Sequence, residues 1–378
     1  MSKVKIQGHA SGSGTLTIGA PNTDSDRTIT LPDTTGTLLD ENSSLPAANL
    51  TGTVADARIS ALTASKLTGA LPAISGASLT DIVSQGRNLI INGGFDVWQR
   101  GTSLAGAASF LADRWFNATS GTQSRQTFTV GQTDVPHNPT YHYRQVTGST
   151  EWYETRQKIE NVAVTAGREV TLSYWMKGSS AFTNAPYRVQ NFGSGGSSAV
   201  SAALSTASIT TSWARYTHTF TFPSISGKTV GAGNSIQINL VRANVNNMTI
   251  DLANCQLEFG DTATDFEQRS YGEELALCQR YYENLTQTSN EFRHNGIAWS
   301  TDNINVPITF LVEKRAAPTI SITSNGDVYN GAWVNATGSA VTGAGTRGCT
   351  VDIQKSSGYV VKYGYFIRGQ VMTSDAEL

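Results

Sequence analysis

Two segments of the chain carry a tryptophan among hydroxyl-bearing and charged side chains. Residues 152–161 and 170–177 alternate in polarity, as a strand with one buried face does. If Gln157, Ile159, Val170 and Leu172 face inward, the tryptophans face outward beside polar groups. A sugar offers an apolar C–H face and hydroxyls, so an exposed aromatic ring flanked by polar groups suits it. The residues predicted to form such a platform are Trp152, Glu154, Arg156, Ser173, Trp175 and Lys177.

Other aromatic residues allow a second interpretation. Each tryptophan has a structural alternative, packing under a loop or between chains, because tryptophan is usually largely buried. Residues 141–143 (YHY) are a weaker candidate for binding. Trp98 and Trp115 follow an Asn-Gly-Gly sequence, and we expect them to be structural.

The sequence has no pattern typical of a metal site or a catalytic nucleophile. Its five histidines include no pair at helical metal spacing, and its three cysteines are too few and too scattered for a zinc site or disulfide framework. We expect no cofactor; a structural calcium ion held by Asp96 and Asp251 is conceivable but not indicated. There is no Gly-x-Ser-x-Gly motif and no β-helix repeat, so the sequence does not favour an enzyme.

The region that holds the predicted platform, residues 87–270, has the spacing of an antiparallel β-sandwich. Strand-like alternation recurs at residues 213–223, 236–242 and 248–259. An apolar run at residues 89–91 precedes Asn92-Gly93-Gly94, which predicts a turn with positive φ.

Residues 271–378 predict a smaller β-domain at the C-terminal end. Residues 271–283 have helical spacing, with Leu275, Cys278 and Tyr282 on one stripe, and we expect a connecting helix with Cys278 as a core thiol. Strand patterns follow at 304–312, 319–323, 349–353 and 359–371. Residues 338–348 are rich in glycine and polar residues and predict a surface loop.

The N-terminal quarter of the chain is unlike the rest. The first aromatic residue is Phe95, so residues 1–94 lack the bulk for a core of their own. Residues 45–86 repeat small residues with one Leu or Ile every few positions, which favours a slender shaft whose apolar row is shared between chains. The alternative is a flexible linker. We therefore divide the stem into residues 1–44 and a shaft at 45–86.

Several motifs resemble bacteriophage tail fibre or receptor-binding proteins. The N-terminal segment and shaft of that family are similar to residues 28–38, TITLPDTTGTL, and 45–53, LPAANLTGT. Carbohydrate-binding jelly rolls, including those of phage tail proteins, resemble residues 170–178, VTLSYWMKG, and 256–267, QLEFGDTATDFE. The order of a helix, RYYE at 280–283 and RAAPT at 315–319 resembles the distal tip of tail fibres.

The resemblance implies a mainly β protein, with an extended trimeric stem followed by a jelly-roll β-sandwich and a C-terminal β tip. It implies a homotrimer, made in the host cytoplasm, that joins phage tail or baseplate proteins through residues 1–44. In the virion it would bind a bacterial surface polysaccharide of lipopolysaccharide or capsule type. One alternative is a structural fibre or baseplate component without a sugar site. A more distant one is a polysaccharide depolymerase, which needs two carboxylates at a set separation.

The overall composition gives no sign of a nucleic-acid-binding or membrane-inserted protein. The net charge is −2 and charged residues make up 15% of the chain, so nothing favours binding to nucleic acid or an anionic membrane. No run of 18 apolar residues exists, and we expect no membrane insertion.

Overall fold

A computed structural model describes residues 86–378, except 107, 119–120, 149–151, 288–293, 330 and 356–357. Near the N-terminus it describes residues 10–15, 17, 24–26 and 28. The chain divides into two compact units, Met1–Ile74 and Ser75–Leu378, and the second contains all the described helices and strands. The predicted attachment segment and shaft lie almost entirely outside the described residues.

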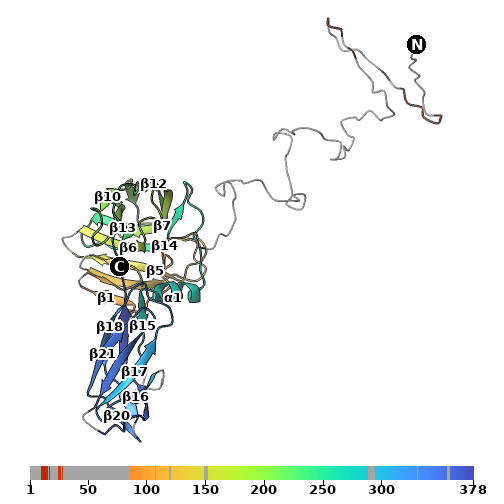
Figure 1. The fold of residues 1–378 in the computed structure, drawn as a ribbon. Coiled ribbons are helices and arrows are strands. Elements are labelled where there is room, and N and C mark those ends of the chain that lie inside the picture. The colour runs from red at the N-terminus through yellow and green to blue at the C-terminus, as the bar shows by residue number, and fades with distance from the viewer. Residues whose placement is uncertain are drawn as a thin grey trace. The chain divides into compact units, whose positions relative to one another are not determined.

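Two six-stranded antiparallel sheets pack face to face as a β-sandwich (Figure 1). Sheet 1 has the order β1 (Ser103–Ala105), β4 (Gly121–Thr127), β5 (Tyr141–Thr147), β14 (Thr249–Phe259), β7 (Glu169–Gly178) and β12 (Ala214–Thr221). Sheet 2 has the order β10 (Val200–Ala203), β9 (Tyr187–Asn191), β13 (Ser235–Asn244), β6 (Trp152–Glu160), β3 (Phe116–Asn117) and β2 (Ser109–Phe110). A short pair, β8 (Phe182–Asn184) and β11 (Ala207–Ile209), completes the sandwich.

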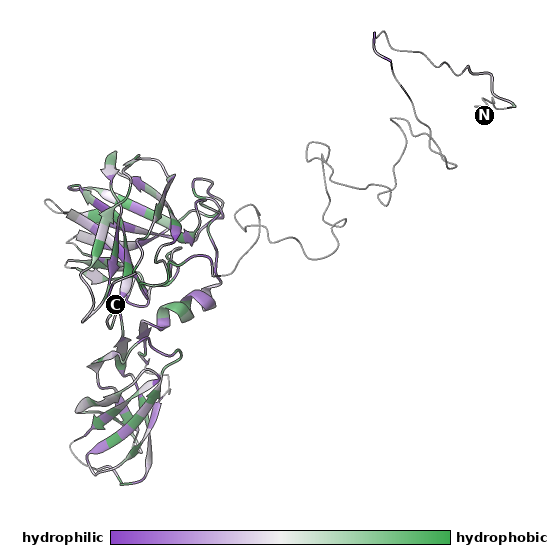
Figure 2. Ribbon diagram, turned by 45° about the horizontal axis from the view of Figure 1, so that its top comes forward, coloured by the Kyte–Doolittle hydropathy of each residue, from purple (hydrophilic) through white to green (hydrophobic). Residues whose placement is uncertain are grey.

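The alternating sequence explains the core of the sandwich. On β7, Val170, Leu172, Tyr174 and Met176 are fully buried against the other sheet. The five predicted strand segments all form strands, with ends shifted by a residue or two, and the alternation of hydropathy is visible along the ribbons (Figure 2). The predicted mainly β fold is therefore confirmed.

The Asn-Gly-Gly turn has a different cause from the expected one. Positive φ falls on Asn92 (56°) and Phe95 (58°), and not on the two glycines between them. Gly93 is required because a Cβ atom there would lie 2.1 Å from the carbonyl oxygen of Cys255 on β14. The backbone N–H of Cys255 in turn donates to the Gly93 carbonyl at 2.9 Å. Close approach of two backbones, rather than a left-handed glycine, explains this sequence.

The C-terminal part, which we call the tip, contains two antiparallel sheets around a second core. The seven-stranded tip sheet has the order β20 (Trp333–Asn335), β19 (Asp327–Tyr329), β23 (Gly364–Arg368), β16 (His294–Ala298), β17 (Asn303–Thr309), β22 (Gly348–Gln354) and β21 (Gly338–Ala344). The three-stranded sheet has the order β15 (Tyr282–Asn284), β24 (Val371–Asp375) and β18 (Thr319–Ser324).

Two expectations for this part are corrected. The loop predicted at residues 338–348 contains β21, which is an edge strand paired with β22. Helix α1 (Tyr271–Gln279) is shorter than expected, because Tyr282 already begins β15. Its buried side chains are Glu274, Cys278 and Gln279, so the buried stripe contains a carboxylate in place of the expected Leu275. All three cysteines are buried.

The last residues of the chain join the tip to the sandwich. The Glu377 carboxylate pairs with Arg114, which is buried, and with Arg100 at 3.2 Å. Lys158 Nζ on β6 donates to the Leu378 carbonyl oxygen at 3.1 Å. The Ala376 N–H donates to the Tyr281 carbonyl oxygen at 2.7 Å. The segment after β24 is therefore bonded both to the sandwich and to the residues that follow α1.

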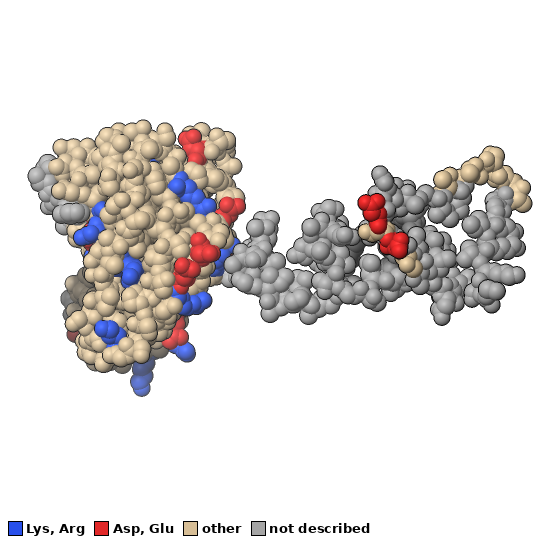
Figure 3. Space-filling view, turned by 90° about the horizontal axis from the view of Figure 1, so that it is seen from above, with Lys and Arg blue, Asp and Glu red and all other residues tan. Residues whose placement is uncertain are grey.

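Charge is spread thinly over the second unit. On the face seen in Figure 3, acidic and basic side chains are scattered among uncharged ones. In the described part of the chain, no helix has the length and apolarity needed to cross a membrane.

Candidate functional site

A hollow of about 690 Å³ opens beside the Asn-Gly-Gly turn, within the size range of ligand pockets. Its wall comes from four parts of the chain: the turn, the β4–β5 connection, the bulge in β14 between Ala253 and Gln256, and the segment that leads from β14 into α1. Its aromatic lining residues are Trp98, Tyr141, Phe266 and Tyr271. Its charged and amide lining residues are Asp96, Gln99, Arg125, His137, Asn138, Asn254, Gln268, Arg269 and Glu274.

The turn places Asp96 at the hollow. Its neighbour Phe95 is fully buried, and its ring lies 5.1 Å from Trp115 and 5.5 Å from Tyr143 between centroids. Packing of this ring holds Phe95 at positive φ, a conformation that costs a bulky residue about 1–3 kcal/mol and is found where geometry matters for function. Val97, on the other side, donates its N–H to Asn92 Oδ1 at 3.0 Å. Asp96 is therefore fixed from both sides.

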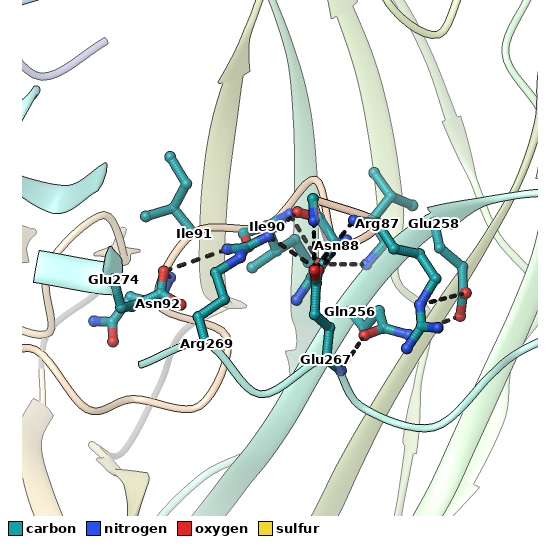
Figure 4. Close-up of polar contacts among 12 residues, drawn as sticks. Arg87, Asn88, Ile90, Ile91, Asn92, Gln256, Glu258, Glu267, Arg269 and Glu274 are labelled. Carbon is teal, nitrogen blue, oxygen red and sulfur yellow. Dashed lines mark hydrogen bonds and ion pairs between the residues drawn. The ribbon is translucent and has the colours of Figure 1, made fainter. Parts of the chain in front are cut away.

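The segment after β14 is tied to the turn by buried carboxylates (Figure 4). Glu267 accepts from the Asn88 N–H at 2.6 Å, and Glu274 accepts from the Asn92 N–H at 2.5 Å. Arg269 lies between them, 3.3 Å from Glu267 and 3.4 Å from Glu274. Each carboxylate thus has a charged partner and a backbone donor, which is what a buried charge needs. Arg269 and Glu274 serve mainly to build the floor of the hollow.

Two polar side chains at the hollow are left available. Asp96 and Arg125 make no side-chain hydrogen bond or ion pair with other residues in the described ranges. The Arg125 guanidinium lies 4.3 Å from the Tyr141 ring centroid, on the same side of sheet 1. An acceptor, a donor and an aromatic surface therefore meet in one place.

Burial raises the pKa values of both carboxyl groups at the hollow. For Asp96 desolvation is the cause. For Glu274 desolvation also dominates; the Asn92 N–H and Arg269 oppose it and Asp96 adds to it. A carboxylate that lacks a protein partner and is partly desolvated gains from a hydroxyl donor supplied by a ligand.

The predicted platform is not assembled as one surface. Ser173, Trp175 and Lys177 lie on the outer face of sheet 1, whereas Glu154 and Arg156 lie on the outer face of sheet 2. The core separates these two faces. Trp152 begins β6, and its side chain lies outside the described residues. The two groups therefore belong to opposite sides of the sandwich.

On sheet 1 the predicted residues have structural partners. Ser173 is buried, and its hydroxyl accepts from Arg215 at 3.3 Å. Lys177 Nζ lies 3.8 Å from Asp251 and 5.2 Å from the Trp213 ring centroid. Trp175 is partly buried. On sheet 2, Arg156 pairs with Glu154 at 3.2 Å and lies over the Phe116 ring, 4.8 Å from its centroid. No contact in the structure tests whether the six predicted platform residues bind a sugar, so their role remains a prediction.

Three groups of residues with secondary roles in the sequence analysis contribute to the hollow. Of residues 141–143, Tyr141 lines the hollow, Tyr143 is in the core and His142 lies on the opposite face of the strand. Asp96, expected only as a conceivable calcium ligand, also lines the hollow, and so does Trp98. Sequence reasoning missed Arg125, Phe266 and Tyr271, although Phe266 belongs to the stretch QLEFGDTATDFE.

The described residues hold no group of three or more His, Cys, Asp or Glu side chains placed for a metal ion. Asp251 does not suit calcium, because Arg144 binds its carboxylate through two contacts, of 2.7 and 2.8 Å.

Comparisons with known proteins give weak structural likeness. A scan against protein-family models found no match, and a search of curated proteins found none. Among solved structures, the CBM22-1–GH10 modules of Clostridium thermocellum xylanase 10B, complexed with xylohexaose, are similar at TM-score 0.32 and 10% identity, over 47% of this chain and 29% of that one. This chain thus spans under a third of that protein.

Two further solved structures are similar to a comparable extent. The CBM22-2 xylan-binding domain from Paenibacillus barcinonensis Xyn10C gives TM-score 0.30 and 10% identity, over 39% of this chain and 92% of that one. The enzymatically active domain of bacteriophage CBA120 tailspike protein 4 gives TM-score 0.30 and 12% identity, over 46% and 22%. TM-scores near 0.3 are too low to carry an argument about ligand or activity.

Proposed function

We propose that the chain binds a bacterial surface glycan in the hollow beside the Asn-Gly-Gly turn. The observation that carries the proposal is that Asp96, a carboxylate without an ion-pair partner, Arg125, a guanidinium without a hydrogen-bond acceptor, and aromatic rings line one space of about 690 Å³. The rings of Tyr141 and Tyr271 would stack on the C–H faces of sugar rings. The carboxylate would accept, and the guanidinium donate, hydrogen bonds to hydroxyl oxygens.

The chemistry supports binding rather than hydrolysis. A glycosidase of the usual kind needs two carboxyl groups facing the substrate, one as acid and one as base or nucleophile. Asp96 is available, but Glu274 already accepts from the Asn92 N–H and contacts Arg269. We therefore propose a binding protein. Release of reducing ends from host polysaccharide by the purified protein would contradict this.

Variants of Asp96 test the site. The full chain is applied to an array of bacterial O-antigen and capsule oligosaccharides, and affinity is measured on the glycans it retains. Asp96→Asn should weaken binding about ten-fold or more, because a charged acceptor is lost. The control is Asp134→Asn, which alters an exposed aspartate of the β4–β5 connection that does not line the hollow. Equal binding by both variants would overturn the assignment.

We further propose that this glycan binding serves adsorption of a phage tail fibre, as the resemblance of residues 28–38 and 45–53 implies. Residues 1–44 would attach to the tail or baseplate, and the shaft would hold three chains together. Deleting residues 1–40 should remove the protein from phage particles while leaving a folded sandwich and tip. Particles that carry the truncated protein at the normal copy number would contradict the attachment role.

A further inference from the structure

The outer face of the tip sheet exposes large apolar side chains. Ile297 on β16, Phe366 on β23 and Trp299, just beyond β16, are 60, 56 and 58% exposed. A shallow depression of about 750 Å³ runs over these strands. Soluble proteins rarely leave such side chains clustered in water, and where they do, the patch usually binds something.

The other face of the same sheet is covered in the ordinary way. Ile304, Val306 and Ile367 are fully buried, and Met372 of the three-stranded sheet packs against this core. Gly296 faces the same side, because a Cβ atom there would lie 2.5 Å from an Ile304 methyl group. Because successive side chains of a strand point to opposite faces, Ile297 and Phe366 lie on the outer face of the sheet. Within the described part of the chain, nothing packs over that face.

The uncovered face is almost free of net charge. Of its side chains on the seven described strands, only three are charged: Asp327, Arg368 and Asp352. Arg368 bonds to Asp327 at 3.1 Å, and Asn305 donates to Asp352 at 2.9 Å. Two identical copies of a highly charged face repel each other, whereas the single net negative charge of this face opposes the approach of a second copy only weakly. The central side chain, Ile297, is aliphatic, and it suits a protein surface better than a sugar ring.

We propose that the outer face of the tip sheet packs against another copy of this chain. The proposal rests on the predicted shaft, in which several chains share one apolar row. Chains joined through a shaft hold their tips at an effective concentration on the order of millimolar, so a modest apolar patch is enough for association. Ile297, Trp299 and Phe366 would be the buried centre of that contact.

Protection of a thiol at the centre of the face tests this in the full chain. The native cysteines are buried, so a maleimide dye reports on an introduced one. Ile297→Cys should react at least about ten-fold more slowly than Val130→Cys, whose site is fully exposed on the β4–β5 connection. Adding Phe366→Asp should separate the faces and restore rapid labelling of Ile297→Cys. Circular dichroism checks that each variant is folded.

The outcomes separate this proposal from glycan binding in the hollow. Rapid labelling of Ile297→Cys in the untreated full chain would overturn the proposal, whatever Asp96→Asn does to affinity. Protection that appears only after host polysaccharide is added would also overturn it, since the face would then be a glycan site. Protection without polysaccharide, abolished by Phe366→Asp, would support it even if Asp96→Asn bound glycan normally.

Discussion

The ammonium nitrogen of Lys314 lies 2.5 Å from Oε2 of Glu283, and both side chains are buried. Lys314 also donates to the Gln279 carbonyl oxygen at the end of α1, and Glu283 Oε1 accepts from the Leu311 N–H at 3.3 Å. Burial lowers the pKa of Lys314, and the Glu283 carboxylate opposes that shift. The pair joins the end of α1, β15 and the segment after β17.

Removing one partner of this pair should destabilise the protein strongly. Lys314→Met leaves the Glu283 carboxylate buried without its cation, and we expect a loss of about 3–5 kcal/mol in the free energy of unfolding. Urea denaturation measures it. Arg347→Met is the matched control, because its pair with Glu313 is exposed on both sides; it should cause no measurable change. Similar stability for the two variants would contradict the structural role of the buried pair.

Gly93 should tolerate no side chain. A Cβ atom 2.1 Å from the Cys255 carbonyl oxygen forces two backbone segments apart, so Gly93→Ala should destabilise by about 1–3 kcal/mol or more. Gly272→Ala is the control, since nothing lies within 4 Å of a Cβ atom there and alanine favours a helix. Thermal unfolding measures both variants. Equal melting temperatures would show that the backbone at Gly93 does not approach the Cys255 carbonyl oxygen closely.

His142 should make the sandwich less stable in acid. Burial lowers its pKa to about 4; Asp251 opposes this, while Arg144 and Lys177 add to it. Neither ring nitrogen has a hydrogen-bond partner in the structure. Between pH 6.5 and 4 the unfolded chain binds a proton there that the folded chain does not, so stability falls as pH falls through this range, by about 3 kcal/mol.

Comparison with His142→Phe isolates this contribution. Burial also raises the pKa of Asp113 to about 6, which favours the folded state as pH falls, but that contribution is present in both proteins. Urea denaturation at pH 4.5 and 7 should therefore show a smaller loss in acid for His142→Phe than for the parent chain. Equal losses would mean that His142 is protonated in the folded state.

Two aromatic substitutions discriminate between the hollow and the platform predicted from the sequence. Tyr271→Ala removes a ring that is 60% exposed at the hollow, and stacking on a sugar contributes about 1 kcal/mol, so affinity for the array-selected glycan should fall about five-fold or more. Trp175→Ala should leave affinity unchanged. The reverse result would place recognition on the outer face of sheet 1.

The full chain should be a trimer. The aromatic-free stem buries apolar area only between chains, so light scattering at micromolar concentration should give three times 40.3 kDa. A monomeric mass would contradict the prediction of a shared shaft. It would also contradict the proposed contact between tips, which depends on the shaft holding several chains together.

Alternation predicted the strands well because each has one buried face, as on β7 with Val170 and Leu172. It could not assign strands to sheets, since the face of a residue is local while the pairing of β6 with β13 and of β7 with β14 is not. The sequence therefore could not show that Glu154 and Arg156 lie on one sheet while Ser173 and Trp175 lie on the other. The hollow could not be predicted from the sequence for the same reason, because Asp96, Arg125 and Tyr271 are far apart in the chain and only folding brings them together.

The double connection between tip and sandwich has a mechanical consequence. The chain enters the tip through α1 and comes back at Ala376–Glu377, where Arg114 and Arg100 hold it. The tip is therefore attached to the sandwich at two points, one covalent and one made of ion pairs, and a rotation about the α1 connection would have to break the ion pairs of Glu377. A single linker would allow the tip to rotate as on a hinge. Two attachment points restrict that rotation, so a force applied to the far end of the tip is transmitted to the sandwich.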